Sequence, residues 1–292
     1  MIPASFEYSS PKTLSEAISL LETSGSDSKI LAGGQSLIPV MKLRLGSPSR
    51  LIDINNIEGL NYIRESDGFL RIGALTRIVD LESSELLKKK YPIINDAASH
   101  IADPTVRNLG TAGGNVSHAD PANDLPATML ALSAEFVATS SGGSRVIKAK
   151  DFFIDAFTTA LKHEEILTEI RIPQFTVGNG GAYLKLEKRV GDFAIAGVAV
   201  QISVTQGVTV AKAGIGLTAV GSSAIEAVEA EQYLIGQTLT AEAISTASKL
   251  AARASNPGTD LRGPGEYKRE MIIVLTTRAL KRAYLRATGG GA

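Results

Sequence analysis

The chain has 292 residues, no cysteine, and 30 basic side chains against 30 acidic ones, so its formal net charge is zero. This length allows a sizeable buried core and two or three domains. The balanced charge argues against a nucleic-acid partner, and the ordinary apolar fraction argues against disorder. The lack of cysteine excludes disulfides, thiolate catalysis and cysteine-held zinc or iron–sulfur centres in this polypeptide, so any redox chemistry requires a bound cofactor.

The start of the chain and its hydropathy favour a cytoplasmic protein. Residues 1–7 lack the basic flank and the apolar run of a signal peptide. The sequence contains no uninterrupted apolar segment long enough to cross a bilayer. We therefore expect a cytoplasmic location and no membrane span.

Residues 1–57 are predicted to form a small β-α-β-α-β unit. Thr13 and Glu16 fit a capping box that opens an amphipathic helix. Ser36 is placed to cap a second helix, shortly after the glycine pair Gly33 and Gly34. The predicted strands are residues 6–8, 29–32 and 50–53. The glycine pair thus lies where a strand meets a helix N-terminus, a place where backbone N–H groups bind phosphate.

Residues 58–175 are predicted to form a second unit of mixed structure. It opens with a hairpin over residues 61–73, turned at residues 66–68. Residues 103–124 are predicted to be a loop-rich segment that carries a second glycine pair. The predicted helices are 76–87, 92–101 and 127–132, and the predicted strands are 135–139, 145–148 and 165–172. This pattern indicates an α+β domain.

A third domain is predicted over residues 176–287, after a stretch at 174–181 that is rich in glycine and polar residues. Its pattern predicts an antiparallel sheet followed by three helices. The predicted strands are 183–187, 196–204 and 208–214, and the predicted helices are 222–235, 241–254 and 265–286. Residues 288–292 are expected to be a flexible tail.

Two glycine segments carry the strongest functional signal. They are Ala32-Gly33-Gly34-Gln35-Ser36 and Thr111-Ala112-Gly113-Gly114-Asn115. Glycine can adopt the positive φ that turns successive N–H groups toward one point, and the second segment has no side chain bulky enough to keep a ligand away. One glycine pair after a strand is commonly a turn, whereas two pairs predict convergence on one anionic ligand. Asn115, Ser117 and Asp124 could hydrogen-bond a ribose or an amide.

Other patterns in the chain have structural interpretations. Gly214, Gly216 and Ala219 satisfy a relaxed dinucleotide-binding pattern after a predicted strand, but Gly221 interrupts the helix that should follow, so we interpret the pattern as structural. The histidines and aspartates between residues 100 and 124 fit no recognised ligand spacing, and we expect no metal site. Signatures of serine–histidine nucleophiles and Walker loops are absent from the sequence. We therefore predict no catalytic side chain.

Several motifs together are specific to one family. They are residues 32–37, 107–115, 120–126 and 183–194, with Arg262, residues 266–269 and residues 278–280. In combination they resemble the FAD-binding medium subunit of the molybdenum hydroxylases, the family of carbon monoxide dehydrogenase, xanthine dehydrogenase and aldehyde oxidoreductase. The resemblance runs from Phe6 to about Ala283, which is essentially the whole chain.

The resemblance implies a two-part FAD-binding domain of the vanillyl-alcohol-oxidase type, in residues 1–57 and 58–175, followed by the C-terminal domain of these subunits. FAD would be bound noncovalently. Both glycine segments, with Leu37, would cradle its pyrophosphate through backbone N–H groups, while Asp124 would hold the adenosine ribose. Lys185 and the turn formed by Gly191, Asp192 and Phe193 would lie near the flavin. Gln35 stands where some relatives have histidine, and Arg107 would serve either the cofactor or a partner subunit.

The implied function is electron transfer within a heteromeric enzyme. A large subunit with a molybdenum cofactor would oxidise the substrate, a small subunit would carry electrons across 2Fe–2S clusters, and FAD would pass them to an external acceptor. The expected assembly is a dimer of heterotrimers. Two other classes stay open, namely a self-sufficient FAD oxidase of the same fold and a non-catalytic nucleotide-binding scaffold. The sequence identifies neither the substrate nor the acceptor, because in the resembled family the substrate pocket lies on another polypeptide.

Overall fold

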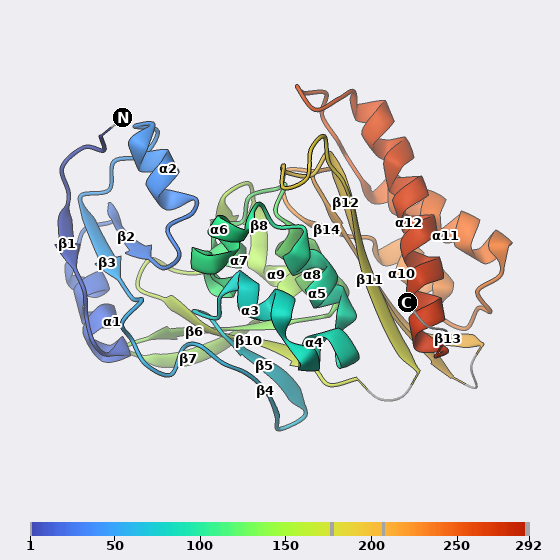
Figure 1. The fold of residues 1–292 in the computed structure, drawn as a ribbon, viewed down its shortest axis with the longest axis horizontal. Coiled ribbons are helices and arrows are strands. Elements are labelled where there is room, and N and C mark those ends of the chain that lie inside the picture. The colour runs from blue at the N-terminus through green and yellow to red at the C-terminus, as the bar shows by residue number, and fades with distance from the viewer. Residues whose placement is uncertain (1, 176–177, 206–207, 290–292) are drawn as a thin grey trace.

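The fold consists of three main sheets with their helices, arranged along the long axis of the molecule (Figure 1). The computed structural model describes residues 2–175, 178–205 and 208–289. Among these residues, no helix combines the length and the apolar character needed to span a bilayer. A part in mixed α and β structure is followed by a C-terminal part with an antiparallel sheet and helices, as the sequence predicts.

The N-terminal unit is a parallel sheet of three strands, ordered β1-β3-β2. Its elements are β1 (Glu7–Ser9), α1 (Leu14–Thr23), β2 (Ser28–Leu31), α2 (Leu37–Lys42) and β3 (Arg50–Asp53). Thr13 begins α1 as predicted, because its hydroxyl accepts a hydrogen bond from the Glu16 N–H at 3.2 Å. Ser36 precedes α2, but within the described part of the chain its hydroxyl caps no backbone N–H, so its predicted capping role is wrong.

The middle unit is built on a five-stranded sheet in the order β4-β5-β10-β6-β7. These strands are β4 (Ile63–Ser66), β5 (Phe69–Gly73), β10 (Ile166–Pro173), β6 (Glu135–Ser140) and β7 (Gly143–Lys148). The predicted hairpin turn is confirmed, since Asp67 and Gly68 have φ of 52° and 79°. The fully buried rings of Phe136 and Phe152, with centroids 4.1 Å apart, lie in the core between this sheet and the helices.

Helices cover one face of the middle sheet (Figure 1). They are α3 (Ile78–Ser83), α4 (Glu85–Lys90), α5 (Pro92–Ser99), α6 (Pro104–Leu109), α7 (Ala112–His118), α8 (Asp124–Ala131) and α9 (Ala149–Phe152), followed by the ribbon of β8 (Phe153–Asp155) and β9 (Thr158–Thr159). The helix predicted over residues 76–87 is divided at Ser84, whose hydroxyl caps α4 by accepting from the Leu87 N–H at 3.4 Å.

The prediction of a loop-rich segment at residues 103–124 is wrong, because this segment contains two helices, α6 and α7. Asp103 accepts from the Val106 N–H at 3.0 Å and so begins α6, with Pro104 in the first helical position. Thr111 likewise accepts from the Gly114 N–H at 3.1 Å and begins α7. The caps stabilise the two helix starts, and α7 forms despite the low helix propensity of Gly113 and Gly114. The glycine pair is therefore a weaker loop signal than the prediction assumed.

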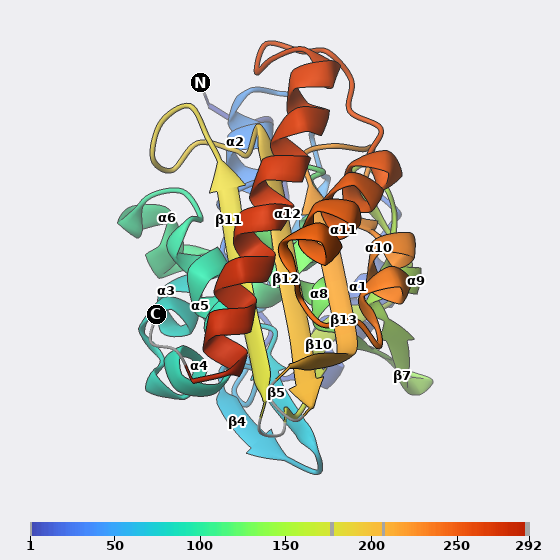
Figure 2. The same cartoon turned by 90° about the vertical axis from the view of Figure 1, so that its right-hand side faces the viewer.

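The C-terminal unit is an antiparallel sheet covered on its outer face by helices (Figure 2). Its elements are β11 (Asn179–Leu186), β12 (Ala196–Thr205), β13 (Thr209–Thr218), β14 (Ile225–Glu226), α10 (Val228–Leu234), α11 (Ala241–Ala254) and α12 (Gly265–Ala287). Ile225 and Glu226 pair with β13, so α10 begins later than the predicted residue 222. Residues 290–292 of the predicted tail lie outside the described residues.

Gly214 and Gly216 allow β13 to pack closely against α8. A Cβ on Gly214 would lie 2.1 Å from the Ala131 carbonyl oxygen, and one on Gly216 would lie 1.9 Å from the Ala127 carbonyl oxygen. Both distances are far below van der Waals contact. These glycines therefore serve the packing of the C-terminal sheet on the middle unit, which confirms the structural interpretation of the dinucleotide-like pattern.

We predict that Gly216→Ala lowers the free energy of unfolding by about 1–3 kcal/mol, because the added methyl group forces β13 away from α8. Urea unfolding measures this change. Gly25→Ala is the matched control, since a Cβ there meets no described atom within 4 Å, and it should change stability by less than about 0.5 kcal/mol. Equal stability of the two variants would contradict this role of Gly216.

Glu231 on α10 makes the stability of the C-terminal unit depend on pH. Burial raises its pKa from 4.5 to about 7, although the Ile215 N–H donates to the carboxylate at 2.7 Å. The folded chain therefore keeps a proton that the unfolded chain releases, so stability should fall as pH rises from about 4.5 to about 7. Glu231→Gln keeps an oxygen acceptor and should flatten this decline in urea titrations at several pH values. An unchanged slope would contradict the assignment.

Candidate cofactor site

The two glycine segments lie next to each other, although almost eighty residues of sequence separate them. A Cβ on Gly33 would lie 2.4 Å from the Leu109 carbonyl oxygen and 2.7 Å from the Gly110 Cα. A Cβ on Gly114 would lie 3.8 Å from the Ala32 Cβ. Figure 1 shows α2 on the side of the N-terminal unit that faces α6 and α7. The two segments therefore pack against each other, which requires a glycine at position 33, and their convergence on one anionic ligand stays a prediction.

The first glycine segment presents a run of free donors. Among the described residues, no hydrogen-bond acceptor is found for the backbone N–H groups of residues 33–37. Gly34 has a φ of 71°, which reverses the chain locally, and the Gln35 amide donates to the Gly33 carbonyl at 2.9 Å and so supports the turn. Consecutive N–H groups without internal partners suit an anion such as phosphate.

The second glycine segment differs from the expectation, because its donors are already used within the chain. The N–H groups of Ala112 and Gly113 donate to Thr76 and Ala74 carbonyls, both at 2.9 Å. The Gly114 N–H donates to the Thr111 hydroxyl at 3.1 Å, and the Asn115 N–H donates to the Thr111 carbonyl at 3.0 Å. The first three are donors that a helix start leaves without an intrahelical partner, and protein atoms satisfy them, while the Asn115 bond is the first bond of the helix itself. The N–H groups of residues 112–114 thus help to pack this segment, and the cofactor cradle expected of it stays a prediction.

Asn115 nevertheless directs an unsatisfied polar atom into this region. Its side-chain oxygen is buried and finds no hydrogen-bond partner among the described residues. Its backbone carbonyl accepts from the Asn123 amide at 3.0 Å, which holds α7 close to the start of α8. A buried acceptor without a partner is costly, so the atom indicates a ligand that donates a hydrogen bond. Ser117 lies half-buried on the same helix.

Asp124 and Lys185 form a buried ion pair between the middle and C-terminal units. Asp124 lies in the first turn of α8, and the Lys185 ammonium on β11 approaches its carboxylate to 3.2 Å. The Lys185 side chain is only 1% exposed, so it is no surface charge at a strand end. The Tyr183 hydroxyl also donates to Asp124. Burial raises the pKa of the Asp124 carboxyl and places that of the Tyr183 hydroxyl well above 10.

This contact bears on the separate roles that we expected for Asp124 and Lys185. The adenosine ribose and the flavin lie on opposite sides of the pyrophosphate of FAD. Two side chains that touch each other would adjoin the same part of such a ligand, so the contact favours one shared location for Asp124 and Lys185 over separate roles at the ribose and the flavin. The Lys185 ammonium already has three acceptors, because it also donates to the His100 carbonyl at 2.8 Å and lies 3.4 Å from Glu187.

The sequence analysis missed Tyr183 and Glu187 as members of this cluster. Tyr183 and Lys185 lie two residues apart on β11, and Glu187 follows the strand directly. Side chains two residues apart point to the same face of a sheet, so these three share one face. A period-two run of polar side chains in an otherwise apolar strand was the available signal. His100 also joins the cluster, with its Nδ1 3.7 Å from a Glu187 oxygen, rather than a metal site. Among the described residues, no group of three or more possible ligands could hold a metal ion.

The turn that carries Asp192 and Phe193 lies beside this cluster. Gly191 has a φ of 88°, and a Cβ there would lie 2.8 Å from the Ala102 carbonyl oxygen. Asp192 is exposed, and Phe193 is 49% exposed with the Arg262 guanidinium 5.5 Å from its ring centroid. The turn therefore presents an aromatic face at the surface.

Arg107 is engaged inside the chain. Its guanidinium contacts Glu82 at 2.7 Å and donates to the Ile101 and Ala102 carbonyls at 3.0 and 3.1 Å. It thus ties the residues that precede α6 to that helix and to Glu82 on α3.

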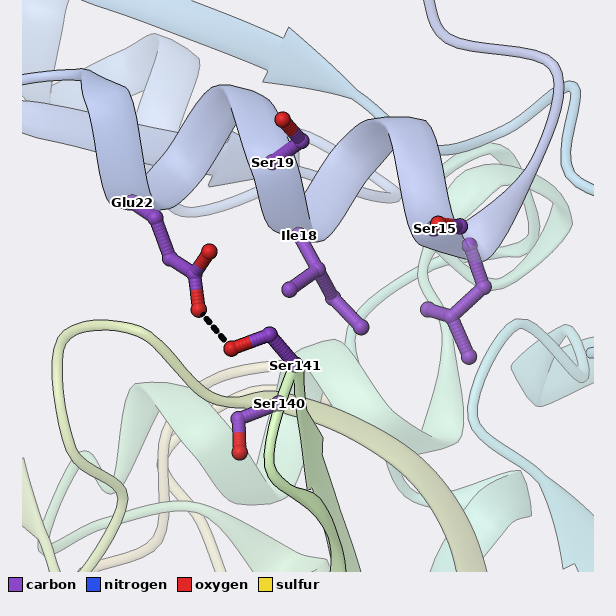
Figure 3. A pocket seen from close by; sticks show the side chains of 7 residues that line it. Ser15, Ile18, Ser19, Glu22, Ser140 and Ser141 are labelled. Carbon is purple, nitrogen blue, oxygen red and sulfur yellow. Dashed lines mark hydrogen bonds between the residues drawn. The ribbon is translucent and has the colours of Figure 1, made fainter.

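A separate pocket of about 460 Å³ lies between α1 and the hairpin of β6 and β7 (Figure 3). Ile18 and several serines line it, and the Ser141 hydroxyl donates to Glu22 across its mouth. None of the predicted site residues lines it. It is therefore distinct from the region where the glycine segments meet.

Comparison with known proteins defines the class. Residues 4–175 match the family described as the FAD binding domain in molybdopterin dehydrogenase, and residues 181–283 match the CO dehydrogenase flavoprotein C-terminal domain. The chain is 43% identical over 286 residues to the carbon monoxide dehydrogenase medium chain of Hydrogenophaga pseudoflava, covering 98% of this chain and 99% of the relative. It is 39% identical over 282 residues to the glyceraldehyde dehydrogenase medium chain of Sulfolobus acidocaldarius, covering 96% and 99%.

A solved structure agrees with these matches. Carbon monoxide dehydrogenase from Hydrogenophaga pseudoflava, in a form that lacks the Mo-pyranopterin moiety of the molybdenum cofactor, superposes with a TM-score of 0.95 at 45% identity, over 98% of this chain and 99% of that chain. The chain belongs to the family of FAD-binding medium subunits of the molybdenum hydroxylases. The resemblance inferred from the motifs is confirmed.

We predict that Lys185→Met destabilises the protein by about 3 kcal/mol at pH 8, because it leaves the buried Asp124 carboxylate without its cation. The loss should be smaller at pH 5, where protonation of Asp124, whose pKa is raised by burial, removes the unpaired charge. Urea unfolding at the two pH values measures the difference. The exposed Lys188→Met is the control, and a pH-independent loss at Lys185 would contradict the pairing.

Proposed function

We propose that the chain is the FAD-carrying electron-transfer subunit of a heteromeric molybdenum hydroxylase. The observation that carries the proposal is the meeting of the two glycine segments: one carries the N–H groups of residues 33–37, which have no acceptor among the described residues, and the other carries the unsatisfied Asn115 oxygen. Electrons would come from a 2Fe–2S subunit and leave through FAD to an external acceptor. The chain contributes no catalytic side chain of its own.

The residues present suit noncovalent FAD. The N–H groups of residues 33–37 would offset the two charges of the pyrophosphate without burying a mobile cation. The Asn115 oxygen would accept a hydrogen bond from a cofactor hydroxyl or amide. The Asp124–Lys185 pair and the turn with Asp192 and Phe193 would adjoin the same end of the cofactor, which we assign to the flavin. Bound FAD supplies the redox chemistry, and the protein orients it.

The domain division follows the predicted scheme. Residues 1–57 and 58–175 would be the two parts of a FAD domain of the vanillyl-alcohol-oxidase type, and residues 176–287 would be the C-terminal domain of medium subunits. The buried apolar cluster over residues 196–283 supports the division of the C-terminal domain from the rest, whereas the cluster of the N-terminal unit also takes in Leu60, Leu75 and Ile166 of the middle unit.

The assembly would include a large molybdenum-cofactor subunit and a small 2Fe–2S subunit, as a dimer of heterotrimers in the cytoplasm. The absence of cysteine from the sequence supports placing the iron–sulfur clusters on another polypeptide. Relatives of similar identity are named for carbon monoxide and for glyceraldehyde, so similarity to this subunit does not select a substrate.

The alternative of a self-sufficient FAD oxidase requires an acid or base free to act on a substrate. Asp124, Lys185 and Glu187 are instead bonded to one another, which favours the subunit proposal. The chain purified alone should therefore not oxidise aldehydes, purines or carbon monoxide, whereas the complex with its iron-, sulfur- and molybdenum-containing partners should oxidise one of them. Substrate-dependent flavin reduction by the chain alone would favour the oxidase instead.

Gly33→Ala should remove FAD from the purified complex, because the added methyl group meets the Leu109 carbonyl and separates the two glycine segments. We expect the FAD dissociation constant to rise by at least about tenfold, which corresponds to about 1.4 kcal/mol. Absorbance near the flavin band and acid-released FAD measure the loss. Gly25→Ala serves as the control, and full FAD occupancy in Gly33→Ala would refute the assignment of this segment.

A further inference from the structure

Glu187 connects two parts of the site that the sequence does not link. It follows β11 directly, and its side chain is 14% exposed. One carboxylate oxygen accepts from the Gly191 N–H at 3.3 Å and lies 3.4 Å from the Lys185 ammonium. The other oxygen lies 3.7 Å from the His100 Nδ1. One side chain thus contacts the exposed turn, the buried ion pair and α5's C-terminal end.

The turn beyond Glu187 has few other internal contacts. Val190 at its tip is 97% exposed, and Lys188 and Arg189 are exposed as well. The backbone is closed by the Asp192 N–H donating to the Arg189 carbonyl at 3.0 Å. Gly191 approaches Ala102 so closely that no side chain fits. The Glu187 carboxylate therefore anchors the positive-φ glycine of a turn that is otherwise mostly solvated.

The charges in the cluster do not balance. Lys185 faces two carboxylates, Asp124 and Glu187, while His100 and Tyr183 complete the titratable groups around them. Asp124 alone would satisfy one lysine. A second, largely buried carboxylate has a desolvation cost, so stability does not account for it. Two carboxylates therefore face one lysine ammonium beside the turn of Phe193.

We propose that Glu187 is a positioning residue of the cofactor site, which fixes the turn bearing Phe193 relative to Lys185 and holds a negative charge at that end of the site. The inference rests on the proposed function, because it takes FAD to be the ligand. Glu187 acts through Gly191 and Lys185 rather than by touching the cofactor.

The test compares Glu187→Gln and Glu187→Ala in the purified complex. Gln keeps an oxygen acceptor for the Gly191 N–H but removes the charge, whereas Ala removes both. Glu187→Ala should raise the FAD dissociation constant about tenfold, and Glu187→Gln less than about threefold. Both variants should shift the FAD midpoint potential in the positive direction, because a negative charge near a cofactor opposes electron uptake.

Glu270→Gln and Glu270→Ala on the exposed side of α12 are the matched controls, and both should keep the wild-type values. Thermal melting establishes that each variant is folded, and if Glu187→Ala does not fold, the potential of Glu187→Gln decides. Wild-type affinity in Glu187→Ala, or an unchanged potential in the folded variants, would overturn the proposal. A wild-type complex without FAD would instead overturn the proposed function.

Discussion

The buried contact of Asp124 with Lys185 and Tyr183 is the interaction on which the arrangement of the site depends. Asp124 comes from the middle unit and both partners come from β11, so the C-terminal unit completes the environment of the site. Gly197 on β12 leaves room for the tyrosine, since a Cβ there would lie 2.7 Å from its hydroxyl. In a low-dielectric interior, each charged group needs its partner, and the two units are thereby fixed to each other.

Glycine is required at several positions because the backbone of another segment packs against it, and less because it makes a loop flexible. Gly33 brings the two glycine segments together, and Gly214 and Gly216 bring β13 against α8. Among these positions, only the neighbouring Gly34 has a positive φ. In the proposed site, a ligand with a pyrophosphate would meet donors mainly from one segment, while the other segment would supply shape and the unsatisfied Asn115 oxygen.

Local signals in the sequence were sufficient for much of the fold. The Thr13 cap, the hairpin turn at Asp67 and Gly68, and the bounds of α11 agree with the predictions because neighbouring residues determine them. The use of the second glycine segment was not predictable, since its N–H groups bond to carbonyls of Thr76 and Ala74, far away in sequence. The burial of Lys185 likewise results from packing between units. The family was predictable because local sequence motifs identify it. The role of each motif residue in the site was not, because it depends on tertiary contacts.

A density map of the FAD-containing complex tests the central claim most directly, because it locates the pyrophosphate relative to the two segments. The account predicts phosphate oxygens within about 2.7–3.2 Å of N–H groups of residues 33–37, with the N–H groups of residues 112–115 still bonded inside the chain. A pyrophosphate held at the start of α7, away from residues 33–37, would contradict it.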